Sequence, residues 1–172
     1  MAKISKKFIL QIVASLLIIL LVLLYFSRYL NPKELDDVTP GISCEKELIE
    51  KSDVLWIIPI FENQSIADNE EWCDEILALN KTLGMHGVYH VYNEFGQERE
   101  GSYIEEGVRE FESCFGYKPT LFKAPQLNLS SENKILLENK GFRVEGKVNQ
   151  VLSKAYHCED TGKFSNKLID LF

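Results

Sequence analysis

The alternation of hydrophobic and polar positions separates one long apolar segment from a mixed region behind it. Residues 8–26 read FILQIVASLLIILLVLLYF, in which Gln11 and Ser15 are the distinctly polar side chains. At a rise of about 1.5 Å per residue, a helix of this length matches a hydrocarbon core of about 30 Å. The following residues, SRYL, offer no small-residue cleavage site of the kind that a cleaved signal peptide has. The pattern predicts an uncleaved transmembrane signal anchor over residues 8–30; the alternative is a buried helix of a soluble protein.

The mixed region, residues 31–172, alternates between short apolar runs and amphipathic segments. Apolar or alternating runs predict strands at 54–61, 120–125 and 142–148. Segments with apolar side chains on one face predict helices at 44–52, 68–84, 103–116 and 131–140, the second of them stopping at Gly84. Strands alternating with helices favour an α/β fold with a mostly parallel sheet, in which functional groups gather at the carboxyl ends of the strands.

The distribution of charge bears on the class of binding partner and on the orientation of the apolar segment in a membrane. The formal net charge of −7 argues against a nucleic-acid partner, because nucleic-acid-binding domains are usually basic. Lys3, Lys6 and Lys7 precede the apolar segment, whereas Arg28 and Lys33 follow it. This bias favours residues 1–7 in the cytoplasm and residues 31–172 outside, as one globular domain on a single-pass membrane anchor. The sequence does not predict an oligomeric state.

The four cysteines, Cys44, Cys73, Cys114 and Cys158, all follow the apolar segment. A location outside the cytoplasm would permit disulfides, and four cysteines allow three pairings among which the sequence does not choose. Unpaired buried cysteines are the alternative. None of the four belongs to a CxxC motif, so a thiolate zinc site is not indicated.

Candidate chemistry centres on two histidines, His86 and His90, in the run MHGVYH. In a helical turn, side chains at this spacing would point the same way. Two imidazoles and a carboxylate can hold a divalent metal and leave one position open for water. Adjacent acidic residues, Asp36 and Asp37, lie upstream. The alternatives are an ordinary structural histidine pair and a solvated acidic turn.

Three segments in order extend this pattern: LDDVTP at 35–40, HGVYH at 86–90 and LFKAP at 121–125. They resemble the first three motifs of the polysaccharide deacetylase (NodB-homology) family. The Glu94-Phe95 pair after HGVYH resembles a poorly characterised deacetylase-like branch of that family. The resemblance covers essentially everything behind the anchor, and it implies a distorted or reduced (β/α) barrel.

The resemblance also implies roles for individual residues. Family members bind a divalent metal, usually zinc, through an aspartate and two histidines. A general base takes a proton from water, and a late histidine protonates the leaving amine. Carried over by motif, the metal ligands are Asp37, His86 and His90; the catalytic residues are Asp36 as base, His157 as acid and Lys123; and the substrate-binding residues are Glu94 and Pro125.

This chain departs from the family at several places. Lys123 stands where the third motif usually has an arginine, and the fourth motif has no convincing counterpart. Two simpler readings stay open: Lys123 could reach solvent, and Glu94 could be a surface residue. The resemblance implies a metal-dependent deacetylase that acts on N-acetylated sugars of an envelope glycan or glycoconjugate. The alternatives are an inactive carbohydrate-binding relative and an anchored interaction domain without a ligand.

Overall fold

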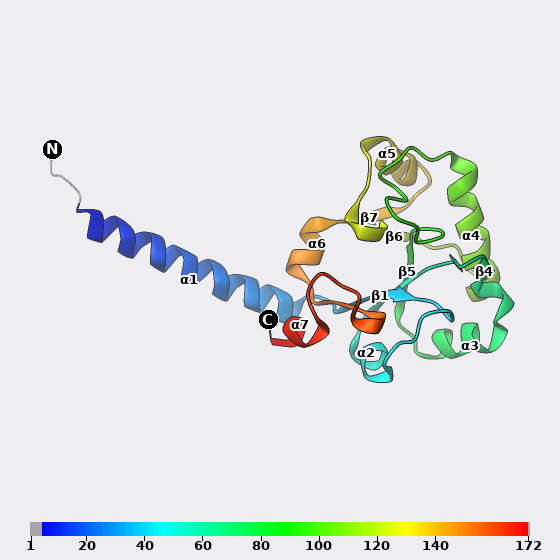
Figure 1. The fold of residues 1–172 in the computed structure, drawn as a ribbon, viewed down its shortest axis with the longest axis horizontal. Coiled ribbons are helices and arrows are strands. Elements are labelled where there is room, and N and C mark those ends of the chain that lie inside the picture. The colour runs from blue at the N-terminus through cyan, green and yellow to red at the C-terminus, as the bar shows by residue number, and fades with distance from the viewer. Residues whose placement is uncertain (1–4, 172) are drawn as a thin grey trace.

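The computed structural model describes residues 5–171, and Figure 1 shows one long helix projecting from an α/β domain. Residues 1–4 of the expected cytoplasmic segment, including Lys3, and the last residue, 172, lie outside the described part. The long helix α1 spans Lys6–Leu30, is capped by Ser5 and has no buried residue. It is long and apolar enough to cross a membrane.

Six strands within residues 5–171 form one sheet in the order β7-β6-β5-β2-β1-β8, and every neighbouring pair is parallel. They are β1 Glu34–Val38, β2 Val54–Ile57, β5 Thr82–His86, β6 Leu121–Lys123, β7 Arg143–Glu145 and β8 Ala155–His157. A two-stranded ladder, β3 Ile60–Phe61 with β4 Gln64–Ser65, lies beside this sheet.

The six-stranded sheet is strongly curled. In a flat sheet, β1 and β6 would be separated by three strand spacings, or roughly 14 Å. The Nζ of Lys123 on β6 nevertheless lies 2.7 Å from an Asp36 oxygen on β1. The parallel order and this curl confirm the predicted reduced (β/α) barrel.

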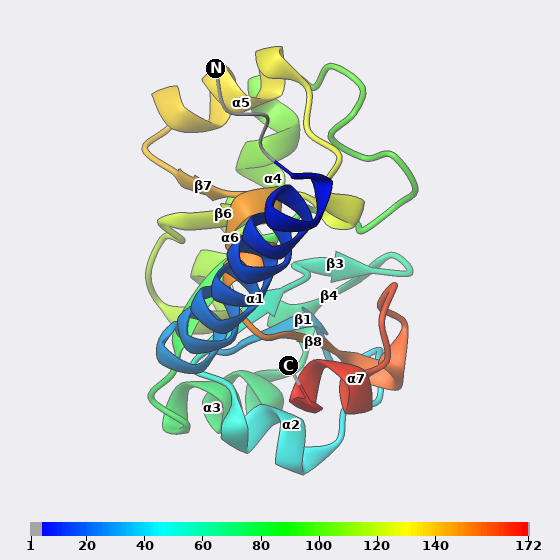
Figure 2. The same ribbon diagram turned by 90° about the vertical axis from the view of Figure 1, so that its left-hand side faces the viewer.

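Helices cover the outer face of the sheet (Figures 1 and 2). Their bounds are α2 Lys46–Lys51, α3 Glu70–Ala78, α4 Gly101–Phe115, α5 Ser131–Asn139, α6 Lys147–Leu152 and α7 Asn166–Leu171. Of these helices, α6 is the exception, because it buries no residue and lies beside the end of α1. Short 3-10 turns occupy Ile66–Asp68, Pro125–Leu127 and Cys158–Asp160. The predicted helix that stops at Gly116 ends there in a left-handed C-cap, and Ser130 caps α5 as expected.

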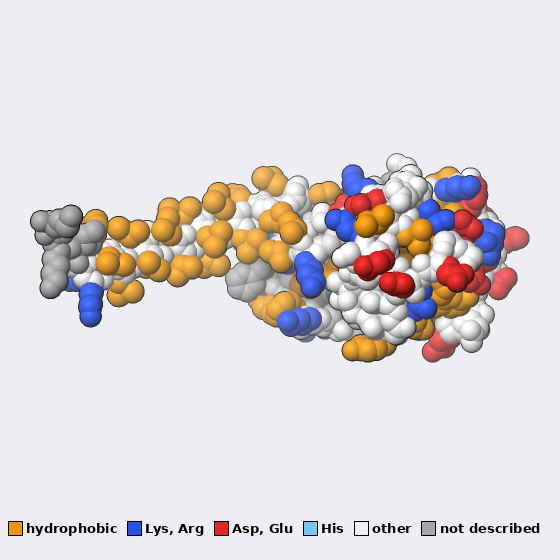
Figure 3. Space-filling model, turned by 90° about the horizontal axis from the view of Figure 1, so that it is seen from above, with side chains coloured by type: hydrophobic (Ala, Val, Ile, Leu, Met, Phe, Trp, Pro, Cys, Tyr) orange, Lys and Arg blue, Asp and Glu red, His pale blue; other side chains and the backbone are white. Residues whose placement is uncertain are grey.

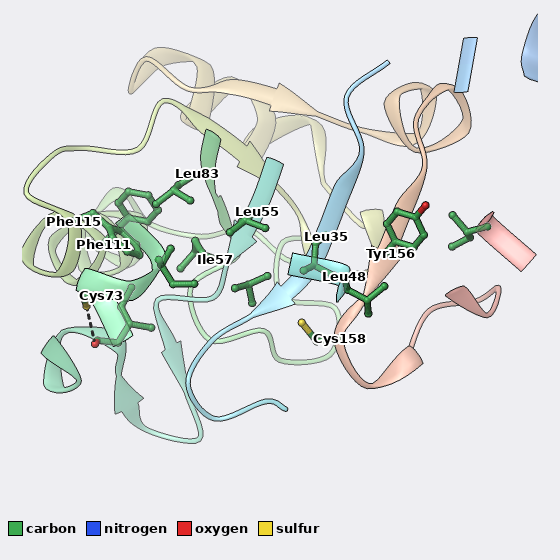
Figure 4. Packing of buried hydrophobic residues seen from close by; sticks show 14 residues of the cluster. Leu35, Leu48, Leu55, Ile57, Cys73, Leu83, Phe111, Phe115, Tyr156 and Cys158 are labelled. Atoms are coloured by element: carbon green, nitrogen blue, oxygen red, sulfur yellow. Dashed lines mark hydrogen bonds between the residues drawn. The ribbon is translucent and has the colours of Figure 1, made fainter. Parts of the chain in front are cut away.

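Strand alternation explains which side chains enter the core. On β1 and β2, Leu35, Leu55 and Ile57 point to the helices, where they pack with α4 and Tyr156 (Figure 4). The residues between them carry the opposite face of the sheet, because successive strand side chains alternate. The side chains that point to this opposite face are those of Glu34, Asp36, Trp56, His86 and Lys123.

The helix expected over 68–84 is wrong at its end. It stops at Ala78, and Gly84 lies inside β5 instead of ending a helix. A Cβ at Gly84 would lie 2.4 Å from the ring of Trp56 on the neighbouring strand. The glycine therefore makes room for a cross-strand tryptophan, which the helical reading could not anticipate.

All three expected strands are also shorter than predicted. The segment 120–125 is a strand only over Leu121–Lys123. The run 54–61 pairs in the main sheet only as far as Ile57, and Pro59, which lacks an N–H, follows. The segment 142–148 is a strand only over Arg143–Glu145, since Lys147 begins α6.

The four cysteines form two disulfides, Cys44–Cys158 and Cys73–Cys114. The second joins α3 to α4 on the outer face. The first ties the segment that follows β1 to the residue directly after His157, at the carboxyl end of β8. It therefore braces the sheet edge where Asp36, Asp37 and His157 lie.

Candidate metal centre and the cavity around it

Two adjacent carboxylates, Asp36 and Asp37, lie near the carboxyl end of β1. The register of β1 against β2 shifts between Leu35 and Val38, and Asp37 has a left-handed φ of 65°. This irregularity brings both carboxylates to the same cavity, although neighbours on a regular strand point to opposite faces. Their exposed fractions are 2% and 5%, so the alternative of a solvated turn is wrong.

The two histidines come from a strand end and a tight loop, not from a helical turn. His86 is the last residue of β5, and the loop that follows passes through left-handed conformations at Gly87 (φ 69°) and His90 (φ 56°). The centroids of the two imidazole rings lie 5.0 Å apart. His86 Nδ1 lies 3.0 Å from the Lys123 carbonyl, which can only accept, so Nδ1 donates there and Nε2 is the ring nitrogen that faces Asp37.

Three ligand atoms converge in a way that suits a divalent cation. Asp37 Oδ1 lies 2.9 Å from His90 Nε2 and 3.4 Å from His86 Nε2. Ligands of a tetrahedral zinc site with bonds of about 2.0–2.1 Å are separated by about 3.3 Å. The carbonyl contact on His86 Nδ1 is the outer partner that metal-bound histidines usually have. The donor set and spacing therefore fit a metal such as zinc.

The charge state of Asp37 suits this use. Burial by itself would raise the pKa of the carboxyl group. Hydrogen bonds with His157, His86 and His90 outweigh burial and hold the pKa of Asp37 well below its usual range. The group is therefore an anion throughout the physiological range.

Lys123 is the buried partner of Asp36. Its Nζ lies 2.7 and 2.8 Å from the two Asp36 oxygens and 2.9 Å from a Glu34 oxygen. Trp56 Nε1 donates to the same Glu34 oxygen at 2.9 Å. Only 1% of Lys123 is exposed, so the alternative that it reaches solvent is wrong. Burial opposes its charge, but Asp36 and Glu34 prevail and raise the pKa of Lys123.

His157 ends β8 and joins the two aspartates. Its Nδ1 lies 3.1 Å from Asp37 Oδ2, and its Nε2 lies 3.7 Å from Asp36 Oδ2. The Thr161 hydroxyl donates to the same Asp37 oxygen at 3.0 Å. Burial would lower the pKa of His157, but the hydrogen bond to Asp37 and the charges of both aspartates raise it. The structure thus brings His157 to the cluster that the sequence predicted for it.

These side chains line a cavity of about 460 Å³. The predicted metal ligands, Asp36, Lys123 and His157 all belong to its wall. Other parts of the wall come from Leu127, from Gln150 on α6 and from Phe164 in the loop before α7. The cavity is large enough for a sugar unit and is walled by both polar and apolar side chains.

Glu94 lies behind the histidine loop, outside the cavity wall. It is completely buried, so the surface-residue alternative is wrong. One carboxylate oxygen accepts from the amides of Val88 (2.9 Å) and Tyr89 (2.8 Å) and from the Tyr103 hydroxyl (2.7 Å). The other accepts from the His90 amide at 3.1 Å. These contacts support a positioning role for Glu94, and substrate contact stays a prediction.

Pro125 is buried as well, and it packs against the same loop. A Cβ at Gly87 would lie 2.6 Å from Pro125 Cγ and 2.2 Å from a Glu94 oxygen. The absence of a side chain at Gly87 therefore lets the loop pass between these two residues. Pro125 does not line the cavity; its neighbours Ala124 and Gln126 do.

Sequence reasoning missed two polar contributors, Glu34 and Thr161. Glu34 stands two residues before Asp36, the spacing that puts strand side chains on one face, and this signal could have identified it. Thr161 follows a 3-10 turn, and no pattern in the sequence marks it. Gln150 and Phe164 lie in the segment for which the sequence predicted no single element.

No family model matches the chain, and no curated protein sequence matches it either. Among solved structures, the chain is similar to a CE4 family pseudoenzyme from Bacillus anthracis, with 14% identity and a TM-score of 0.43 over 53% of this chain and 31% of that one. It is similar to a polysaccharide deacetylase from Bacillus cereus, with 12% identity and a TM-score of 0.47 over 67% and 60%. It is also similar to the chitin deacetylase of the fungal pathogen Colletotrichum lindemuthianum, with 11% identity and a TM-score of 0.49 over 81% of this chain and 65% of that one. The chain spans about a third of the length of the first of these proteins.

Proposed function

We propose that this chain is a membrane-anchored, extracytoplasmic, metal-dependent deacetylase that hydrolyses the amide of N-acetylated sugars in an envelope glycan or glycoconjugate. The observation that carries the proposal is the convergence of Asp37, His86 and His90 beside a buried Asp36–Lys123 pair in one cavity. The ordered sequence motifs around these residues support the same reaction.

The chain supplies three functions around the acetamide. Asp37, His86 and His90 would hold a divalent ion, which when bound would polarise the carbonyl and lower the pKa of water at its open position. Asp36 would accept the proton of the attacking water, and Lys123 fixes the orientation of its carboxylate. His157 would donate a proton to the departing amine nitrogen from its position beside both aspartates.

The proposed location rests on α1 and on the disulfides. The helix is long and apolar enough to span a bilayer, and the lysines before it favour a cytoplasmic N-terminus. All four cysteines are paired, which is usual in oxidising compartments and rare in the cytoplasm. Both observations support a domain outside the membrane.

The test uses the full chain purified in detergent. We expect close to one zinc per chain by elemental analysis after dialysis, and none in the His86→Ala/His90→Ala double variant. Acetate release from N-acetylated oligosaccharides should be lost in Asp36→Asn while zinc is retained. A wild-type chain that retains no divalent metal would overturn the proposal.

One observation favours a second candidate, a carbohydrate-binding relative without activity. Both oxygens of Asp36 already accept from Lys123, so fewer of their lone pairs are open to a water molecule. In that case the chain would bind zinc and N-acetylated oligosaccharide, but no acetate would be released by either wild type or Asp36→Asn.

A further inference from the structure

The end of α1 is hydrogen-bonded to the short helix α6. Arg28 Nη1 donates to the Val151 carbonyl at 3.1 Å, and Asn31 Nδ2 donates to the Leu152 carbonyl at 3.0 Å. The 25 residues of α1 extend roughly 37 Å, longer than a hydrocarbon core of about 30 Å. The last turn of α1 therefore reaches the headgroup layer, and α6 is held beside it at that height.

Two short helices flank this end of α1 and expose aliphatic side chains. In Figure 1, α6 and α7 lie on either side of the last turns of α1, and Figure 2 shows that α7 stands farther from them than α6 does. The end of α7 is joined to the start of β8 by a hydrogen bond from Lys154 Nζ to the Asp170 carbonyl at 2.7 Å. The exposed fractions are 69% for Val148 and 53% for Val151 on α6, and 40% for Leu168 and 72% for Leu171 on α7. Within the described residues, each of these side chains therefore keeps a large share of its surface open.

Basic residues gather around the same helices, although the chain as a whole is acidic. Lys147 begins α6, and Lys167 lies next to Leu168 on α7. Burial lowers the pKa of Lys154, and the nearby charges of Arg28, Lys33 and Lys51 lower it further, although Asp170 opposes them. In Figure 3, the surface next to α1 carries apolar and basic side chains, and acidic ones begin farther along the domain.

We propose that α6 and α7 form a membrane-seating face, made of Val148, Val151, Leu168 and Leu171 with the surrounding lysines, that rests in the interfacial layer of an anionic bilayer beside α1. Aliphatic side chains would enter the acyl boundary, and ammonium groups would face lipid phosphates. The inference rests on the proposed membrane anchor, because α1 sets the height of this face.

The membrane-seating face would also set the distance between the cavity and the membrane surface. Gln150 lines the cavity, and its neighbour Val151 belongs to the seating face. Seating α6 in the bilayer therefore holds the cavity at a fixed, short distance from the headgroups. Its ligand would be a sugar within reach of the membrane surface, rather than glycan far from the membrane.

The experiment uses the full chain in vesicles of phosphatidylcholine and phosphatidylglycerol whose acyl chains carry bromine near the headgroup. Leu168→Trp is compared with Leu77→Trp on α3, because these leucines are exposed to the same degree, 40% and 39%. The wild type, with Trp56 and Trp72, gives the background. We expect bromine to quench the added fluorescence at least twofold more at residue 168 than at residue 77, and Val151→Trp to behave like Leu168→Trp.

Two different failures can be told apart. If the chain does not float with the vesicles in a density gradient, the anchor and the seat are both wrong. If it floats but residues 168 and 151 are quenched no more than residue 77, the seating face alone is overturned. The latter result would also be expected if a second copy of the chain covered this face.

Discussion

Replacing Glu94 by glutamine tests whether this buried carboxylate holds the histidine loop in the conformation that brings His90 to the candidate metal site. The carboxylate receives three backbone N–H groups, among them that of His90 itself, and the Tyr103 hydroxyl. Successive amides wrapped around an anion hold a loop in conformations that it would otherwise avoid. Here the left-handed φ of 56° at His90 is such a conformation. Glu94→Gln keeps the shape of the side chain but removes the charge.

The expected cost follows from the contacts. Glutamine keeps one acceptor oxygen but turns an NH₂ group toward the His90 amide, so one bond to a charged group, worth about 1.5–3 kcal/mol, is lost. The three remaining bonds lose their charge assistance, which is about half of their strength. Relief from burying a charge offsets part of this, so the free energy of unfolding should fall by about 2–4 kcal/mol. Residues that orient metal ligands typically change metal affinity by about 10–100-fold, and we expect a loss in that range.

The assay is zinc affinity, measured by competition with a chromophoric chelator, together with urea unfolding of the full chain in detergent. Glu98→Gln, four residues on and exposed to solvent, is the matched control and should change neither quantity. If Glu94 acts through His90, the double variant Glu94→Gln/His90→Ala should bind zinc no more weakly than His90→Ala. Additive losses, or unchanged affinity in Glu94→Gln, would refute the reasoning.

Three other predictions concern the frame of the site. Lys123→Met leaves two buried carboxylates without their cation and should cost about 3–5 kcal/mol in urea unfolding. Because the folded pKa of Lys123 is raised above its ordinary value of 10.5, its ion pairs stabilise fully below that pH and lose their contribution as the pH rises through the folded value. The wild type should therefore lose stability more steeply than Lys123→Met in alkaline unfolding series. Replacing both Cys44 and Cys158 by serine should cost about 4–5 kcal/mol and weaken zinc binding, whereas the same change at Cys73 and Cys114 should leave zinc affinity unchanged.

Several elements of the central domain, such as β2, β6, α4 and α5, could be predicted because their periodicities are local, whereas β5 begins inside a predicted helix and the chain beyond residue 148 had no single predicted element. The apolar run before Asn31 and the amphipathic stripe of α4 depend on nothing else in the chain. Gly84 could not be assigned correctly, because its reason for being glycine is Trp56 on another strand. From the local sequence alone, a glycine that ends an amphipathic helix looks the same as a glycine that makes room for an aromatic ring on a neighbouring strand.

In the candidate site, too, local features could be predicted from the sequence, whereas features that depend on distant contacts could not. The ordered motifs identified Asp36, His86 and His90 because the strand ends that carry them are short and contiguous. The pairing of the cysteines and the burial of Glu94 depend on how distant segments meet. Nothing near Glu94 in the sequence distinguishes a carboxylate that faces solvent from one enclosed by three amides.

Lys123 suits its surroundings better than an arginine would. An ammonium group has three donors, and Lys123 directs them at three oxygens, two of Asp36 and one of Glu34. A guanidinium has five donors in a planar fork, and at a position with 1% exposure the extra donors would need partners. Glu34 is therefore the residue that makes a lysine workable here, since it supplies the third acceptor and is itself held by Trp56. The lysine that stands where the resembling motif has an arginine is thus matched by Glu34 on β1, two residues before Asp36.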